Sequence, residues 1–103
     1  MQPTETKPSI QIENIDKIVH EPGRLIILLH LYNVEKVDFN NLMKQTGLSK
    51  GNLSSHLSKL EEAGYIDIEK EFIEKIPHTL LALTETGRQA FRDYRQVILK
   101  LLA

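Results

Sequence analysis

Residues 38–64 read DFNNLMKQTGLSKGNLSSHLSKLEEAG, a pattern that predicts a helix, a tight turn and a second helix. The first helix, expected over residues 39–46, needs a left-handed residue at its end. Gly47 stands at that point, and glycine adopts a positive φ without steric cost. Ser49 then follows as the N-cap of the second helix, because its hydroxyl can accept from the free N–H groups of the first turn. The second helix is expected over residues 50–63, where it stops before a further glycine.

The second helix of this stretch has two chemically different faces. Leu53, Leu57 and Leu60 recur at helical spacing and predict one buried stripe. The opposite face holds small or flexible side chains that form hydrogen bonds: Lys50, Asn52, Ser54, Ser55, Ser58 and Lys59. It carries two cations and no acid before Glu61, so it could lie against phosphates and base edges in a major groove. The alternative is an ordinary solvated helix face.

Gly51 lies just inside this helix, where glycine is less favourable than alanine by about 1 kcal/mol. The missing side chain would let the helix N-terminus approach a phosphate, whose charge suits the free N–H groups and the helix dipole. A loosely started helix is the structural alternative.

Residues 38–64 resemble the helix-turn-helix of winged-helix transcription regulators of the MarR/ArsR type. The likeness continues in LEEAGYI (residues 60–66), in LTETGRQAF (residues 83–91) and in PGRLIIL (residues 22–28), with the parts in the order that the family shows. The resemblance implies a mainly α winged helix-turn-helix with a small β-hairpin wing, of class α+β. It also implies extra N-terminal helices and a long C-terminal helix that serve dimerisation.

A chain of 103 residues is of the length that forms one domain. Residues 1–11 are polar with two prolines, and we expect a disordered tail there. Apolar spacing predicts a short helix over residues 12–20 and another that begins at Glu21–Pro22, since proline is tolerated in a first turn. Residues 12–103 then form a single winged-helix DNA-binding domain, divided into the helix-turn-helix (38–64), the wing (65–83) and the C-terminal helix (84–102).

The wing is expected to have strands at residues 65–69 and 79–83, with a loop between them. Two lysines stand against four carboxylates between Asp67 and His78, a net charge of −2. A net acidic wing should not be drawn strongly to phosphate, so Lys75 and His78 are only secondary candidates for DNA contact. Where this chain reads FIEKIPH (residues 72–78), sequences of the family often carry glycine and paired arginines.

The closing helix has an apolar stripe longer than a winged-helix core of this size can cover. Exposed continuous apolar surface usually marks an interface, and a two-fold dimer is the commonest arrangement. We therefore expect a homodimer, with the groove between the terminal helices as a possible place for an unidentified apolar small-molecule effector. The dimerisation residues predicted from the stripe are Phe91, Tyr94, Val97, Ile98, Leu101 and Leu102.

Composition excludes several other classes. The chain has no cysteine, which excludes disulfides and thiolate metal sites, and its 4 histidines are too widely spaced to suggest a metal. There is no Gly-x-Ser-x-Gly turn and no nameable set of nucleophile, base and orienting group, so we expect neither an enzyme nor a cofactor. No apolar run is long enough for a bilayer and the N-terminus is not a signal peptide, which predicts a cytoplasmic protein without membrane contact.

The sequence favours a sequence-specific, dimeric DNA-binding transcription regulator with residues 50–63 in the major groove of double-stranded DNA. Asn52 and Ser55 are the base-edge candidates. The full predicted DNA-binding set is Ser49, Lys50, Gly51, Asn52, Ser54, Ser55, Ser58, Lys59, Lys75 and His78. The alternative is a winged-helix protein–protein interaction module without autonomous DNA binding, which the net charge of −1 and the acidic wing favour.

Overall fold

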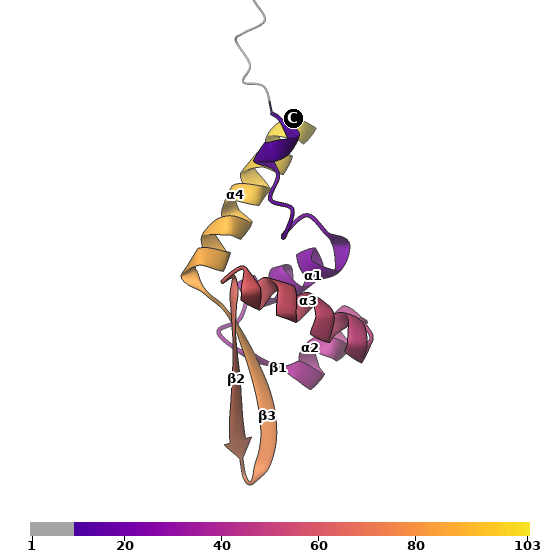
Figure 1. Ribbon diagram of the computed structural model, residues 1–103, viewed down its shortest axis with the longest axis vertical. Coiled ribbons are helices and arrows are strands. Elements are labelled where there is room, and N and C mark those ends of the chain that lie inside the picture. The colour runs from indigo at the N-terminus through magenta and orange to yellow at the C-terminus, as the bar shows by residue number, and fades with distance from the viewer. Residues whose placement is uncertain (1–9) are drawn as a thin grey trace, which may run out of the picture.

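The computed structural model describes residues 10–103, which form four α-helices and a three-stranded antiparallel sheet (Figure 1). This arrangement confirms the predicted fold class. Most of the tail predicted at residues 1–11 lies outside the described residues. In chain order the elements are a 3₁₀ turn η2 (Ile12–Asn14), α1 (Pro22–Tyr32), β1 (Val37–Asp38), α2 (Phe39–Thr46), α3 (Lys50–Glu62), β2 (Ile66–Ile73), β3 (Ile76–Leu83) and α4 (Glu85–Leu102).

The helix-turn-helix forms through the two predicted caps, Gly47 and Ser49, and a third cap at Asp38. The Asp38 carboxylate accepts from the backbone N–H groups of Asn40 and Asn41, which starts α2. Gly47 ends α2 with φ of 75°, in the left-handed region. The Ser49 hydroxyl then accepts from the Asn52 N–H and starts α3. Both helices therefore lie within one residue of their predicted bounds.

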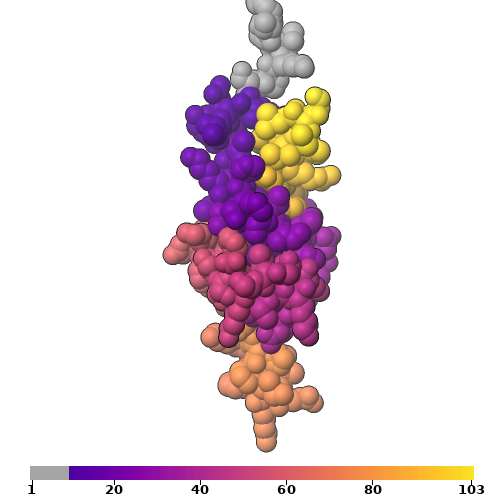
Figure 2. Space-filling model, turned by 90° about the vertical axis from the view of Figure 1, so that its right-hand side faces the viewer, coloured from indigo at the N-terminus to yellow at the C-terminus, as the bar shows by residue number. Residues whose placement is uncertain are grey.

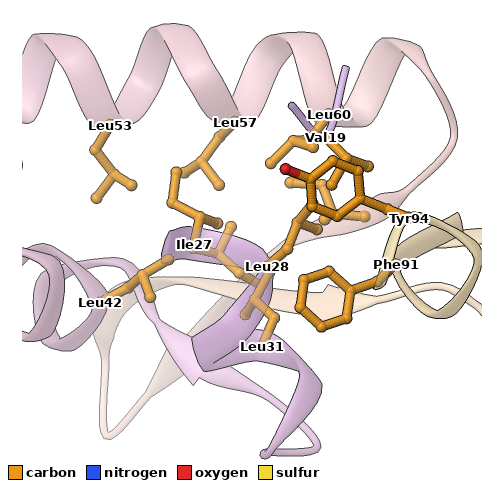
Figure 3. Packing of buried hydrophobic residues seen from close by; sticks show 12 residues of the cluster. Val19, Ile27, Leu28, Leu31, Leu42, Leu53, Leu57, Leu60, Phe91 and Tyr94 are labelled. Carbon is orange, nitrogen blue, oxygen red and sulfur yellow. The ribbon is translucent and has the colours of Figure 1, made fainter. Parts of the chain in front are cut away.

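The core is a layer of leucine and isoleucine between α1 and α3, extended by aromatic rings from α4 (Figure 3). Its fully buried side chains include Ile27, Leu28, Leu31, Leu42, Leu53 and Leu60. The predicted stripe of α3 is confirmed, because its three leucines are buried. This packing fixes which face of α3 points away from the molecule.

The helix predicted over residues 12–20 is wrong. Only η2 forms there, and a turn follows. The Asp16 carboxylate accepts from the N–H groups of Ile18 (2.8 Å) and Val19 (3.1 Å). A side chain that bonds to nearby backbone in this way competes with helical hydrogen bonds. The turn still buries Val19 completely, so the segment packs on the core without being a helix.

The wing is a longer and more regular hairpin than predicted. The sheet order is β1-β3-β2, and β2 and β3 pair without interruption from Ile66↔Leu83 to Ile73↔Ile76. The predicted loop between the strands is therefore wrong: only Glu74 and Lys75 form the turn, with φ of 51° and 69°. Two consecutive residues with positive φ define the type of turn that matches strand twist. Phe72, Ile73 and Ile76 favour strand structure and carry the pairing to this turn.

The closing helix α4 begins after its N-cap Thr84, whose hydroxyl accepts from the Gly87 N–H. Phe91 and Tyr94 of this helix are each only 8% exposed, and their rings lie against Tyr32 and His20. Their prediction as dimerisation residues needs correction, since both belong to the core of their own subunit. The last turns of α4 extend beside η2, away from the other helices (Figures 1 and 2).

Candidate nucleic-acid interface

The outer face of α3 is fully available to a ligand. The predicted residues of this helix and its cap are all exposed: Ser49, Lys50, Gly51, Asn52, Ser54, Ser55, Ser58 and Lys59. The buried leucines on the other side of α3 hold this face outward. The structure therefore brings together the whole helical part of the predicted site.

A groove of about 510 Å³ runs between α3, the N-terminus of α2 and the wing. Its floor is apolar, formed by Leu57, Ile68 and Leu81. Its walls are polar, with hydroxyl groups and lysines from α3, β2 and β3, and with Asp38 and Asn40 at the start of α2. The polar lining residues from α3 and the wing are Lys50, Ser54, Ser58, Lys70, His78 and Thr79. Part of the predicted helix face thus continues across the groove onto the wing.

The wing separates its charges onto two faces. Side chains alternate along a strand, so Lys70, paired with Thr79, shares a face with the groove-floor residues Ile68 and Leu81. By the same alternation the carboxylates of β2 at positions 67, 69 and 71 lie on the opposite face. On that face Glu69 forms an ion pair with Lys36 at 2.9 Å. The net acidity of the wing is therefore directed away from the groove.

Lys70 is the residue that the sequence interpretation missed. The signal was present, because Lys70 follows Ile66 and Ile68 at a spacing of two, and a strand that buries these residues must place Lys70 on the same side. The net charge of the whole wing does not show on which face of the strand each charged residue lies.

The two wing residues predicted as secondary DNA contacts lie in different places. His78 borders the groove, but its Nδ1 is 3.0 Å from Oδ1 of Asp38. The hydrogen bond from His78 lowers the pKa of Asp38, and the N–H groups of Asn41 and Asn40 act in the same direction, against the effect of burial. His78 therefore helps to hold the cap of α2. Lys75 lies at the far turn of the hairpin, and the structure does not bring it into the groove.

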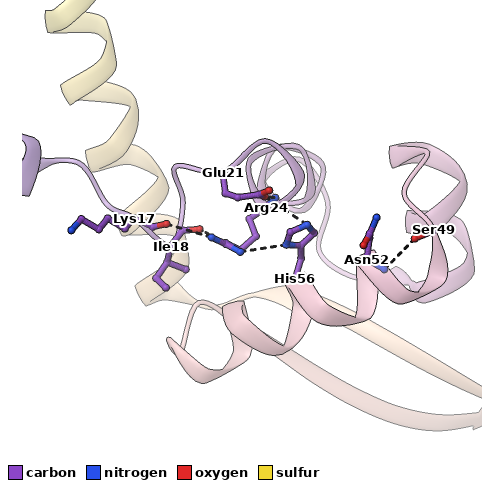
Figure 4. A network of polar contacts seen from close by, with 7 residues as sticks. All are labelled: Lys17, Ile18, Glu21, Arg24, Ser49, Asn52 and His56. Carbon is purple, nitrogen blue, oxygen red and sulfur yellow. Dashed lines mark hydrogen bonds and ion pairs between the residues drawn. The ribbon is translucent and has the colours of Figure 1, made fainter.

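His56 anchors α3 to α1 (Figure 4). Its Nδ1 lies 3.3 Å from Nη1 of Arg24, and its Nε2 lies 3.7 Å from Oε1 of Glu21. The Arg24 N–H lowers the pKa of Glu21, with burial opposing and the charges of His56 and Arg24 assisting. A Cβ on Gly23 would lie 2.5 Å from His56 Nε2, so the absent side chain makes room for the ring. His56 thus packs at the edge of the buried stripe.

A family model described as a winged helix DNA-binding domain matches residues 24–102. The chain belongs to this winged helix DNA-binding family. The matched region contains α2, α3, the wing, all of α4 and α1 except its first two residues, and it confirms the resemblance that residues 38–64 predicted.

Three known proteins are similar to this winged helix protein. It is 40% identical over 85 residues to the uncharacterized protein MJ0432 of Methanocaldococcus jannaschii, covering 82% of this chain and 92% of that protein. The structure of a transcriptional regulator homologue protein from Pyrococcus horikoshii OT3 has a TM-score of 0.82 at 26% identity, covering 88% of this chain and 91% of that chain. The structure of overoxidized AbfR bound to DNA shares the fold, with a TM-score of 0.67 and 23% identity over 75% of this chain and 56% of that chain.

A second cavity of this winged helix protein, of about 580 Å³, lies between η2 and α4. Its lining includes the carboxylates of Glu13, Asp16 and Asp93 beside Tyr65 and Tyr94. It is not the apolar groove between subunits that was expected to hold an effector, and that effector stays a prediction. Within residues 10–103 no three histidine or acidic side chains gather to hold a metal ion, and none of the described helices could cross a bilayer.

Proposed function

We propose that this protein is a homodimeric transcription regulator that places α3 in the major groove of double-stranded DNA. The observation that carries the proposal is the continuous surface of α3 and the inner wing face. This surface joins Lys50 and Lys70 to hydroxyl groups of α3 and the wing, while the carboxylates of β2 lie on the opposite face of the wing. Lys59 is exposed elsewhere on α3. The family description and the AbfR complex with DNA support the same ligand.

Within this proposal one group of residues contacts base edges and another contacts phosphates. Asn52 and Ser55, on the exposed face of α3, are the base-edge contacts, because amide and hydroxyl groups pair with base edges in the major groove. Lysines and serines along the groove are the phosphate contacts, which position the protein without reading sequence. These phosphate contacts are Lys50, Ser54, Ser58 and Lys70, with Lys59 at the outer end of α3.

The dimer would form through the distal part of α4. Leu99 and Leu101 are each 50% exposed and Leu102 is 77% exposed, so at least half of each of these apolar side chains is left uncovered by the described part of the chain. A two-fold axis there would present two α3 helices about 34 Å apart, one helical turn of DNA, to a pseudo-palindromic site.

The test is binding to random duplex DNA of about 30 base pairs, roughly three helical turns, at low and at moderate salt. Wild type is compared with Lys50→Ala/Lys59→Ala and with the charge-matched control Lys17→Ala/Lys36→Ala, whose exposed lysines lie off the α3 surface. The α3 variant should lose affinity, and its slope of log affinity against log salt should fall by about 1.8, since each phosphate contact contributes about 0.9.

Two outcomes would contradict the proposal. If both double variants lose the same affinity, binding follows net charge and not the α3 surface. If wild type remains a folded dimer but binds no DNA even at low salt, the protein is better explained as a protein–protein interaction module.

A further inference from the structure

The outer face of the wing carries a row of exposed carboxylates. Asp67, Glu69 and Glu71 recur at every second residue of β2 on the side away from the groove, and each is exposed. Lys36 pairs with Glu69, so three carboxylates stand against one ammonium group, a net charge of −2. Asp67 and Glu71 form no ion pair within residues 10–103. The outer wing face therefore suits a cationic partner.

A basic surface lies on α4, where three arginines form an arginine stripe: Arg88, Arg92 and Arg95. They follow one another at intervals of four and three residues, a spacing that places them on one face of the helix. Glu85 Oε2 lies 3.6 Å from Arg92 Nη2, so three guanidinium groups stand against one carboxylate, a net charge of +2. Asp93 lies on another side of α4, where it borders the second cavity. The arginine stripe and the outer wing face thus carry opposite charges.

The arginine stripe keeps hydrogen-bond donors for a partner. Arg88, at its inner end, donates from Nη1 to the Tyr32 carbonyl at 3.3 Å and lies 4.7 Å from the centroid of the Tyr32 ring. The Arg92 side chain is 39% exposed and donates to Gln89 Oε1 at 2.9 Å. Arg95 is exposed and forms no ion pair within the described part of the chain. Since a guanidinium has five N–H donors, these contacts leave most of the donors unused.

The two charged surfaces have similar lengths. Asp67 and Glu71 are four residues apart on a strand, which is about 13 Å. Arg88 and Arg95 are seven residues apart on a helix, which is about 10.5 Å. Three carboxylates can therefore face three guanidinium groups along one line. Pairs of this kind are often bidentate, which adds geometric specificity to the attraction.

The arginine stripe and the outer wing face do not meet within one chain. The wing projects from the helices at one end of the molecule, and α4 extends toward the other end (Figure 1). None of the ion pairs within residues 10–103 joins the stripe to the wing. The net charge of the whole chain is only −1, so two copies repel each other weakly and local opposite charges decide how they meet.

We propose that the outer wing face of one copy of this protein binds the arginine stripe of a second copy. The contact joins two different surfaces, so it is head-to-tail and builds assemblies larger than the proposed dimer. It leaves the groove free, because the outer wing face points away from it. It does not depend on the proposed DNA binding. A polyanion would suit the arginine stripe alone, whereas a second copy satisfies both charged surfaces at once.

The experiment is analytical ultracentrifugation of the full-length chain without DNA. Salt is set at about 0.01 M, where charges act over about 30 Å, and at about 1 M, where they act over about 3 Å. The mean mass of wild type should be about twofold or more higher at low salt, since each head-to-tail contact joins two units. Arg92→Glu/Arg95→Glu and Asp67→Lys/Glu71→Lys should each lose this increase.

The controls reverse equal numbers of charges away from both surfaces. Lys44→Glu/Lys59→Glu matches the arginine variant, and Glu61→Lys/Glu62→Lys matches the wing variant, because all four residues are exposed on α2 or α3. Both controls should associate as wild type does. Combining the two surface reversals in one chain keeps the net charge of −1 and makes the wing basic and the stripe acidic, so association at low salt should return.

Three results would overturn the inference. One is a wild-type mass that does not change with salt. Another is a surface variant that associates as strongly as its matched control, which would show that its surface is not part of the contact. The third is a combined variant that is folded by circular dichroism but does not regain association. The mass at high salt separately tests the proposed dimer, because that dimer depends on apolar contacts at the end of α4.

Discussion

Gly23 and His56 show how two residues far apart in the sequence fix the position of α3. The His56 ring occupies the space that a side chain at position 23 would need, and it contacts Arg24 and Glu21 there. We predict that Gly23→Ala displaces the ring and lowers the free energy of unfolding by about 1 kcal/mol, the contribution of one lost hydrogen bond. The measurement is urea unfolding.

The control for this prediction is the same substitution in a His56→Ala background. Alanine there meets no ring, so Gly23→Ala should be neutral or stabilising, because alanine is the better helix former. An equal loss of stability in both backgrounds would contradict the steric explanation.

Gly51 gives the opposite case, because a Cβ there would meet nothing within 4 Å. We predict that Gly51→Ala raises the free energy of unfolding by up to about 1 kcal/mol through helix propensity and a less flexible unfolded chain. The same substitution should weaken DNA binding, since the methyl group would lie between the α3 N-terminus and a phosphate. Urea unfolding and a gel shift test the two halves, and tighter DNA binding would refute the predicted role of Gly51.

Tyr65 makes stability sensitive to alkaline pH. Burial raises its pKa to about 12, and the hydrogen bond from its hydroxyl to Asp16 Oδ2 acts in the same direction. In the unfolded chain the tyrosine loses its proton near its ordinary pKa of about 10. Between these values the folded protein binds more protons than the unfolded one, so stability falls as pH rises from about 10 to about 12. Tyr65→Phe should show a shallower decline than wild type in urea unfolding over this range, and parallel declines would contradict the prediction.

Among the elements, those whose boundaries depend on local chemistry were the ones that could be predicted from sequence. Asp38, Gly47 and Ser49 each act on backbone within a few residues, and α2 and α3 formed where these residues placed them. The segment at residues 12–20 failed because apolar spacing does not reveal that Asp16 bonds to its own backbone neighbours. The predicted DNA-binding residues of α3 came from the spacing within one helix, and Lys70 could have been placed in the same way from its spacing of two after Ile66 and Ile68.

The two faces of the wing give a prediction for β2. Lys70→Ala should reduce DNA affinity and lower the salt slope by about 0.9, because it removes one phosphate contact from the groove. Lys36→Ala removes the same charge from the outer face, where Lys36 is paired with Glu69, and should leave the slope unchanged. Fluorescence anisotropy with a labelled duplex at several salt concentrations compares the two variants. If the salt slope is the same for Lys70→Ala and Lys36→Ala, the groove face of the wing does not contact DNA.

For the whole molecule, the exposed end of α4 predicts which substitutions would dissociate the proposed dimer. Leu101→Asp/Leu102→Asp should raise the dimer Kd about a hundredfold or more, since an unpaired carboxylate left in an interface is unfavourable by roughly 3 kcal/mol. Leu29→Asp is the control, because Leu29 is also an exposed leucine but lies on α1. Analytical ultracentrifugation measures the dimer, and circular dichroism checks that the helices remain. If Leu29→Asp dissociates to the same extent, the interface does not lie specifically at the end of α4.

Opposite charges on the two faces of the wing also affect how the molecule meets a polyanion. The carboxylates of β2 point one way and Lys70 points the other, so the hairpin is a small electric dipole across its thickness. In the field of a duplex this dipole experiences a torque that turns the groove toward the DNA and the outer face away from it. Encounters would then begin already oriented, and the wing would contribute to the rate of association more than to the lifetime of the complex.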